Sequence, residues 1–236
     1  MMSDKIGDFP EQDPRGVAFH VAQTAVGAAD IAIPGAGYAL QQIVGHFVGE
    51  PLQKRRDEWF RQLGARLLEL QNRFEGFDPS NLEGNEAFVS VVYEATHVAM
   101  KSHKEFKREA LANAVLNVAI GQTIDEALQG RFMACIESFS AAHIRLLSVL
   151  AAPSAYEKCV AMANRMSMGS QSVIIRAEIS TDEISEPLFG VVVADLIREG
   201  FIDGGMNVMT TNNAFLSRRT TATGDSFLAF IRSPPG

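Results

Sequence analysis

The chain has 236 residues, 47% of them hydrophobic, and a formal net charge of −7 at neutral pH. This length allows one or two domains with a full hydrophobic core. The acidic balance disfavours general affinity for nucleic acids, which depends on neutralising phosphates with lysine and arginine. The two cysteines, Cys135 and Cys159, fall within helical patterns, and we expect them to be small buried hydrophobic residues in a reducing compartment.

The N-terminal region divides into two parts. Residues 1–15 are acidic and interrupted by prolines, so we expect a disordered terminus rather than a secretory signal, and a cytoplasmic protein. Residues 16–50 are apolar and rich in glycine and alanine, with Asp30 as the only charge expected before Glu50. Pro34-Gly35 interrupts this segment, which predicts two short helices, because one membrane span needs about 20 uninterrupted apolar residues.

Gly45 and Gly49, with Phe47 between them, have the G-x-x-x-G spacing that lets two helix backbones approach closely. One interpretation buries the segment against the rest of the protein or against another subunit. The alternative places it in a membrane, which would locate the protein at the periphery of the inner membrane.

A long amphipathic helix is predicted from Pro51 to Phe74. Its apolar residues recur at steps of three, four and seven, which keeps one helix face apolar, and they are Leu52, Trp59, Leu63, Leu67, Leu70 and Phe74. The opposite face is rich in arginine. This helix and the segment before it supply the candidate residues for oligomer or membrane contact, which are Gly45, Phe47, Gly49, Arg55, Arg56 and Trp59.

Four further helices are predicted up to residue 168, at about 85–102, 105–121, 123–150 and 155–166. The third is the strongest prediction, because one apolar stripe holds for some seven turns through Ile124, Leu128, Phe132, Ile136, Phe139, His143, Leu147 and Leu150. Capping boxes are expected at Ser102 with Glu105 and at Thr123 with Glu126. Residues 51–168 are therefore interpreted as a helical bundle.

Three polar residues lie on otherwise apolar helix faces and are interpreted as structural. Asn113 and Asn117 are one turn apart, and buried amides of this kind need hydrogen-bond partners, so they would fix helix register or cap a neighbouring segment. His143 belongs to the long apolar stripe and is expected to be a hydrogen-bonded core histidine.

Residues 170–236 have a different pattern. Thr181 to Glu183 opens a short helix, 187–199 reads as another, and two short β-like runs follow at 206–209 and 214–217. A last amphipathic helix begins at Thr223-Gly224. The run from Leu196 to Ile202, followed by Thr221 to Phe227, resembles the L-x-x-x-G-L-I … T-x-x-G-x-x-F pattern of winged-helix modules, with Phe201 in place of the second leucine.

A winged-helix resemblance implies fold more than DNA binding. The helix at the recognition position carries Asp195 and Glu199, which the phosphates of a duplex would repel. Candidate nucleic-acid contacts are Arg198, Arg218 and Arg219. We favour a protein-contact or packing role for this module and keep DNA binding as the alternative.

Motifs for catalysis are not found. The chain lacks G-x-x-x-x-G-K-[ST], G-x-S-x-G and H-E-x-x-H sequences. Glu94 and His97 have the Glu-x-x-His spacing of di-iron bundles, but a second copy is missing, and the histidines and cysteines match no usual zinc spacing. We therefore expect no catalytic residues, no metal and no cofactor, and a protein that is not an enzyme.

The run from Ala95 to Asn117 resembles an uncharacterised bacterial family of helical proteins, whose members read roughly A-x-x-x-T/S-H-x-E-K-x-x-A-L-x-N-A-x-x-N. The chain keeps Lys107, Asn113, Ala114 and Asn117 of that pattern. The order of a small-residue start, a basic-aromatic helix, a helical body and a winged-helix-like end is similar to the abortive-infection alpha type of phage-defence proteins. The resemblance implies no catalytic residues.

The predicted fold class is mainly α, a helical bundle followed by a small winged-helix-like α+β module. We weigh two alternative functions for a protein of this architecture. The first is a non-enzymatic interaction or effector protein, linked to bacterial phage defence, that self-associates, binds protein partners or touches a membrane surface through residues 16–50. The second is a DNA-binding transcriptional regulator that works through residues 170–236.

Overall fold

The computed structural model describes residues 50–74, 77–82, 84–102, 104–122, 124–207, 209–211 and 214–234. These residues are mainly helical, as the sequence predicts. The chain divides into two compact units, Met1–Met100 and Lys101–Pro235. Residues 101–168, which the sequence groups with the preceding helices, lie in the same unit as the C-terminal residues.

Several predictions for the N-terminal region lie outside the described residues. They are the disordered terminus at 1–15, the small-residue segment at 16–50 except for its last residue, and the candidate contacts Gly45, Phe47 and Gly49. No helix in the part of the chain that the structure describes is both long enough and apolar enough to span a membrane.

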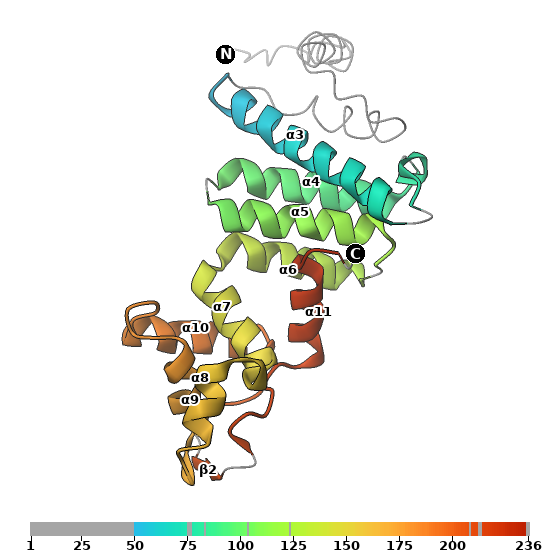
Figure 1. The fold of residues 1–236 in the computed structure, drawn as a ribbon. Helices are drawn as coiled ribbons and strands as arrows, with labels where there is room; N and C mark the ends of the chain where they lie inside the picture. The colour runs from blue at the N-terminus through green and yellow to red at the C-terminus, as the bar shows by residue number, and fades with distance from the viewer. Residues whose placement is uncertain are drawn as a thin grey trace, which may run out of the picture. The chain divides into compact units, whose positions relative to one another are not determined.

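The described part of the N-terminal unit contains α3 (Glu50–Arg73), the 3-10 helix η1 (Pro79–Leu82) and most of α4 (Glu86–Lys101). Helices α3 and α4 lie side by side (Figure 1). The predicted apolar stripe of α3 is buried at Trp59, Leu63, Leu67 and Leu70. The predicted core residues of α4 are also buried, namely Phe88, Val92, Ala95 and Ala99. The 3.6-residue periodicity therefore identified both buried faces.

The C-terminal unit contains every described helix and strand that comes after α4 in the chain. Its helices are α5 (Glu105–Ala119), α6 (Glu126–Ser138), α7 (Ala141–Ala151), the 3-10 helix η2 (Pro153–Ala155), α8 (Glu157–Ala163), α9 (Gln171–Glu178), α10 (Glu186–Arg198) and α11 (Ala222–Ile231). Two strands, β1 (Met168–Ser170) and β2 (Met209–Thr211), form an antiparallel pair. Helix α11 packs against α5 and α7, although it lies far from both in sequence.

Five phenylalanines form the centre of this unit, Phe132, Phe139, Phe201, Phe227 and Phe230, and all are buried. The Phe201 and Phe227 rings stack with their centroids 4.6 Å apart, and Phe132 meets Phe227 edge to face at 5.4 Å. Such aromatic pairs stabilise a core by about 0.5–1.5 kcal/mol each beyond the area that they bury. The cluster joins α6, α11 and the residues after α10 into one core.

The prediction of one long helix at 123–150 is wrong, because the structure has two helices there, α6 and α7. Phe139 is extended, with φ −71° and ψ 148°, and Ser140 is the N-cap residue of α7. The apolar stripe continues through the break because Phe139, His143 and Leu147 all face the same core. Periodicity alone therefore could not detect the break.

Helix starts also differ in detail from the predicted capping boxes. Asp125 caps α6, and its carboxylate accepts hydrogen bonds from the backbone N–H groups of Ala127 at 3.0 Å and Leu128 at 3.4 Å. Lys104 is the N-cap residue of α5, and Ser102 accepts a hydrogen bond from its backbone N–H. Asp125 is as good a cap as the threonine that the sequence suggested.

The described residues of 206–209 and 214–217 do not pair into the predicted β-hairpin. Strand β2 pairs instead with β1, in the register Met168 to Thr211 and Ser170 to Met209. Ala214 to Leu216 form turns. Helix α9 was not predicted, because its Val-Ile-Ile centre is rich in β-branched residues with weak helix propensity, and the helix predicted from Thr181 to Glu183 is a turn.

The motif that suggested a winged helix has a clear role in packing. Gly200 has φ +70°, a left-handed conformation that ends α10 and favours glycine. Thr221 caps α11 by accepting a hydrogen bond from the Gly224 N–H at 3.1 Å, and its own N–H and hydroxyl bind the carbonyls of Phe201 and Gly200. A Cβ atom at Gly224 would lie 2.1 Å from the Phe201 carbonyl oxygen, so glycine is needed there.

Asn113 and Asn117 bind the C-terminal end of α11. The amide of Asn117 donates to the carbonyls of Ala229, Phe230 and Arg232 at 3.1, 2.9 and 2.8 Å. The amide of Asn113 donates to Ile231 at 2.9 Å. The last carbonyls of a helix lack intrahelical partners, so these two amides satisfy groups that would otherwise be buried at a cost.

Candidate functional site

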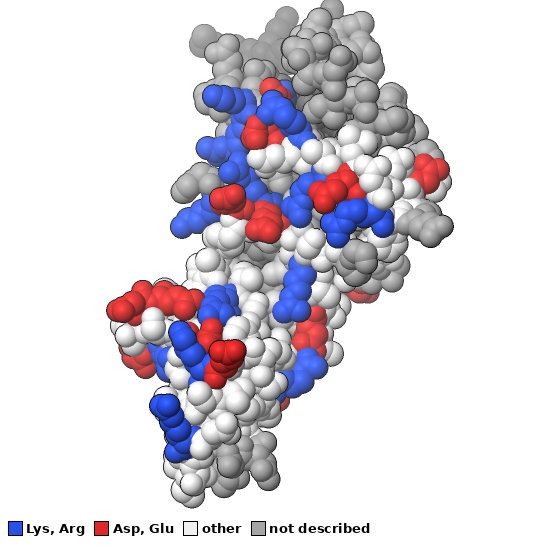
Figure 2. Space-filling model, viewed as in Figure 1, with Lys and Arg blue, Asp and Glu red and all other residues white. Residues whose placement is uncertain are grey.

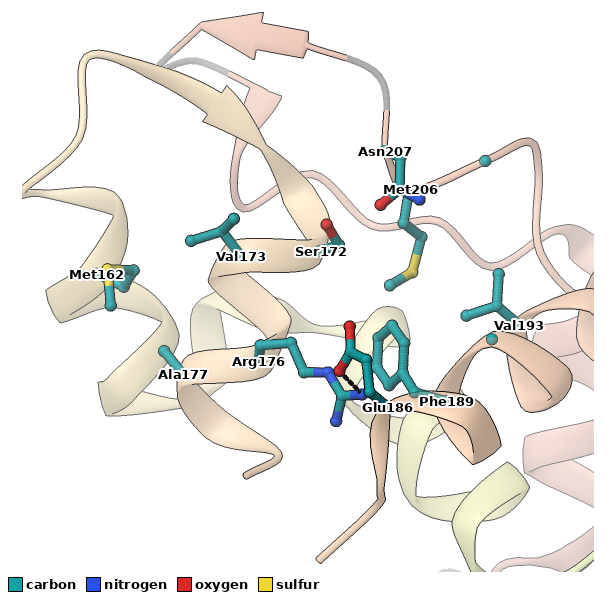
Figure 3. Close-up of a pocket in the computed structure, with 12 residues that line it drawn as sticks. Met162, Ser172, Val173, Arg176, Ala177, Glu186, Phe189, Val193, Met206 and Asn207 are labelled. Carbon is teal, nitrogen blue, oxygen red and sulfur yellow. Dashed lines mark hydrogen bonds and ion pairs between the residues drawn. The ribbon is translucent and has the colours of Figure 1, made fainter. Parts of the chain in front are cut away.

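A pocket lies between α9 and α10 in the C-terminal unit (Figure 3), with a volume of about 590 Å³. Most of its lining is apolar, with Met162 from α8, Val173 and Ala177 from α9, Phe189, Gly190 and Val193 from α10, and Met206 from the following loop. Its polar lining is Ser172, Arg176, Glu186 and Asn207. A concave apolar site with a few polar groups is the usual form of a ligand site.

Arg176 is the cationic group of this pocket. Its side chain is 15% exposed, and its guanidinium carbon lies 3.8 Å from the centroid of the Phe189 ring. One terminal nitrogen donates to the Ile184 carbonyl at 2.6 Å, and the other pairs with Glu186. Figure 3 shows the guanidinium beside the ring, with the ion pair to Glu186 dashed. The guanidinium is therefore held in a fixed orientation.

The outer face of α10, formed by Leu188, Val191 and Ala194, is apolar and exposed to solvent. Leu188 is 41% exposed and Val191 54%. This is the helix that would occupy the recognition position of a winged helix. Its outer face offers no group that reads base edges, which requires hydrogen-bonding side chains.

The candidate contacts on α3 are not all at the surface. Trp59 is 1% exposed and donates its indole N–H to the Thr96 hydroxyl at 3.0 Å. Arg56 is 6% exposed, and Arg55 donates to the carbonyl of Met100 at 2.7 Å. The side chains of Trp59 and Arg56 thus belong to the interior of the N-terminal unit.

The three candidate nucleic-acid contacts all have carboxylate partners. Arg198 lies 2.9 Å from Asp195, Arg218 pairs with Asp225, and Arg219 lies 3.6 Å from Asp203. Basic and acidic groups lie next to each other over the C-terminal unit in Figure 2. A phosphate backbone would have to compete with these ion pairs, but exposed pairs contribute only about 0–1 kcal/mol, so they do not decide against the DNA-binding alternative.

His143 is buried, and its ring connects α7 to α10. The Ser140 backbone N–H donates to Nδ1 at 3.1 Å, and Nε2 lies 3.1 Å from the Asp195 carboxylate. Because Nδ1 accepts a hydrogen bond, Nε2 carries the proton and donates to Asp195. The ring also stacks on Phe139, with centroids 4.4 Å apart.

Ser140, His143 and Asp195 form a row of the residue types that make a hydrolytic triad, since the serine hydroxyl lies 2.9 Å from Nδ1. A general base needs a lone pair that is available to the nucleophile. The Nδ1 lone pair already accepts the Ser140 backbone N–H, so the ring cannot take the hydroxyl proton without breaking the start of α7. The row therefore supports a structural role.

The two cysteines are buried thiols. Burial is the main cause that raises the pKa of Cys135 to about 12, and the Glu199 carboxylate, with a sulfur-oxygen distance of 3.7 Å, raises it further. Burial also raises the pKa of Cys159 to about 11. Thiolate is the reactive form of cysteine, so neither sulfur is activated as a nucleophile.

We expect thiol reagents at pH 8 to label Cys159 roughly two hundredfold and Cys135 roughly two thousandfold more slowly in the folded protein than in denaturant, because ordinary thiols have a pKa near 8.5. Below the pKa of the unfolded thiols, the contribution of the two raised pKa values to the stability of the folded state is fully present. It is lost as the pH rises from there through the folded values of about 11 and 12. Labelling kinetics with 5,5′-dithiobis(2-nitrobenzoate) and peptide mapping measure the first effect, and urea midpoints between pH 8 and 10 measure the second.

Glu199→Gln is the matched variant for this expectation. It removes the carboxylate beside Cys135 and leaves the surroundings of Cys159 unchanged. Labelling should become faster at Cys135 alone. A Cys135 labelling rate that is the same in the variant as in the wild type would contradict the role given to Glu199.

In the part of the chain that the structure describes, no three side chains of histidine, cysteine, aspartate or glutamate lie close enough to hold a metal ion. The described residues thus form a mainly helical protein whose candidate site is the pocket between α9 and α10. No protein-family model, curated protein or solved structure matches this chain.

The sequence did not reveal this pocket. Arg176 belongs to a helix that was not predicted, and the lining comes from α8, α9, α10 and the loop before β2. One signal was present, which is a charged residue placed next to the apolar run Val173-Ile174-Ile175. That signal alone does not distinguish a pocket from an ordinary amphipathic helix.

Proposed function

We propose that this chain is a non-enzymatic interaction protein that acts by self-association through the outer face of α10. The observation that carries the proposal is the exposure of Leu188 and Val191, at 41% and 54%, one helical turn apart on the outer face of α10. Exposed apolar patches on soluble proteins mark interaction surfaces more often than scattered single residues do. The layout resemblance to abortive-infection alpha proteins adds the proposal of a role in bacterial phage defence.

A second copy of the chain is the partner that the charges of α10 favour. Arg198, at the last turn, has a side chain that is 68% exposed, and Glu186, at the first turn, has one that is 73% exposed. Antiparallel packing of two copies would place Arg198 of each near Glu186 of the other. Antiparallel helix dipoles also attract each other, and two-fold symmetry is the commonest form of self-association.

The C-terminal residues are proposed to be a winged-helix-like module used for protein contact. Support comes from the order α9, α10 and α11, and from the antiparallel bridge between Ile202 and Thr220 that connects the two ends of the motif. Strand β2 pairs with β1 and not with the described residues of 214–217, so the module departs from the pattern in its wing. Residues 16–50 stay a second proposed contact segment, for another subunit or for a membrane surface.

Light scattering coupled to gel filtration tests self-association. The wild-type chain is expected to shift from monomer to dimer mass as its concentration rises, and Val191→Glu is expected to remain monomeric, because it places two like charges at the centre of the interface. Ala134→Glu adds the same charge at an exposed position of α6 and should dimerise like the wild type. A monomer at every concentration, or a dimer unaffected by Val191→Glu, would refute the proposal.

A further inference from the structure

The pocket between α9 and α10 has the size of a small-molecule site. Its volume of about 590 Å³ lies within the roughly 300–1,000 Å³ that is usual for such sites. Its walls are apolar side chains from three helices, which can cover the hydrophobic body of a ligand. A single cation, Arg176, lies among them.

Arg176 is prepared to bind an anion. The Ile184 carbonyl and the face of the Phe189 ring fix its orientation, so little side-chain entropy remains to be lost on binding. Its Nε is buried and has no hydrogen-bond partner in the structure. A buried guanidinium with unused hydrogen-bonding capacity is unusual, because such groups normally find partners.

The present counter-ion of Arg176 can be displaced at low cost. The side chain of Glu186 is 73% exposed, whereas that of Arg176 is 15% exposed. Ion pairs of exposed carboxylates contribute only about 0–1 kcal/mol, and water can solvate Glu186 if it turns outward. An anion held between the apolar walls would interact with Arg176 at a lower local dielectric, and therefore more strongly.

We propose that this pocket binds a small amphiphilic anion, with its acidic group on Arg176 and its apolar body against Met162, Val173, Phe189 and Met206. Glu186 occupies the place of the acidic group when the pocket is empty. Ser172 at the start of α9 and Asn207 in the loop after α10, both labelled in Figure 3, provide further hydrogen-bonding groups for the ligand. This site differs from the outer face of α10, whose residues do not line the pocket.

Two fluorescent probes of similar size test the proposal with the full-length protein. 1-Anilinonaphthalene-8-sulfonate carries an anionic group, and N-phenyl-1-naphthylamine has the same aromatic body without it. The wild type should bind the anionic probe more tightly. Arg176→Met should weaken the anionic probe at least about tenfold, the loss expected for a charged hydrogen bond, and leave the neutral probe unchanged.

Glu186→Gln gives the most specific expectation, because its effect has the opposite sign. It removes the competing carboxylate, so binding of the anionic probe should tighten several-fold. Weaker binding in this variant would overturn the proposal. Arg73→Gln removes an exposed charge of α3, outside both the pocket and α10, and should leave both affinities unchanged.

Gly190→Leu serves as a variant that does not depend on removing a charge. Gly190 lines the pocket inside α10, and a Cβ there meets nothing within 4 Å. Leucine should therefore be accepted by the helix and should fill the pocket, with loss of both probes and an unchanged circular dichroism spectrum. Because unfolded or loosely packed states also bind the anionic probe, near-ultraviolet spectra must match the wild type in every variant compared.

Two further outcomes would overturn the proposal. Anionic-probe binding that persists in both Arg176→Met and Gly190→Leu would place the site elsewhere. Equal binding of the two probes, independent of Arg176, would reduce the pocket to an apolar groove. Val191→Glu should bind the probes like the wild type, so this site and the self-association surface can fail separately.

Discussion

Replacing Gly224 by alanine is expected to destabilise the C-terminal unit by about 3 kcal/mol or more, at the upper end of the range for overpacking. The added Cβ would lie 2.1 Å from the backbone oxygen of Phe201 and 2.9 Å from its carbonyl carbon. A backbone group cannot rotate away as a side chain can, so α11 or the residues after α10 must move. Either movement breaks the Thr221 contacts or separates Phe227 from Phe201. Urea unfolding followed by far-ultraviolet circular dichroism measures the change.

Gly130→Ala is the matched control for this substitution. Gly130 is an exposed residue inside α6, and a Cβ there meets nothing within 4 Å. Alanine has a higher helix propensity, so this variant should gain about 0.5–1 kcal/mol. A Gly224→Ala variant as stable as the wild type would contradict the close contact between the start of α11 and the Phe201 carbonyl group.

Replacing Asn117 by aspartate, which has almost the same shape, is expected to destabilise the unit by about 3–5 kcal/mol at pH 7, the range for an unpaired buried charge. The amide now donates to three carbonyls at the end of α11. A carboxylate cannot donate, and it would lie at the negative end of a helix dipole. The loss should therefore exceed that of Asn117→Ala, which removes the hydrogen bonds alone, at about 1–3 kcal/mol.

The pH dependence provides the test of this explanation. The fold would raise the pKa of the new carboxyl above its unfolded value near 3.9. Stability relative to the wild type would then be partly regained at low pH, because the neutral carboxyl has one O–H to donate, and would be lost as the pH rises from about 4 through the raised pKa. Urea midpoints at pH 4 and pH 7 measure this difference. An Asn117→Asp variant as stable as Asn117→Ala at both values would contradict the proposed role of the amide.

Periodicity predicted the helices whose burial repeats along one face. The apolar stripe of α3 and the core of α4 followed the 3.6-residue rule, and the structure confirms both. The same rule failed at Phe139, because the stripe continued across the break between α6 and α7. The decisive information there is the extended backbone and the hydrogen bonds of Ser140, which no pattern of apolar residues contains.

Long-range features could not be predicted from local patterns. Strand β1 has three residues and pairs with a strand about 40 residues later, so no turn between them marks the pairing. Asn113 and Asn117 were expected to need partners, but their distance in sequence from α11 hid which segment they bind. The pocket has the same origin, because its walls come from several helices and a loop.

The binding of Asn117 to α11 has a consequence for the synthesis of the protein. The hydrogen bonds join residues that are more than 110 positions apart, with separations of 112, 113 and 115. Contacts of such high contact order form late, because the intervening chain must first be ordered. Helix α5 therefore lacks its partner α11 until that helix has left the ribosome, and the surface that α11 covers remains open to chaperones until then.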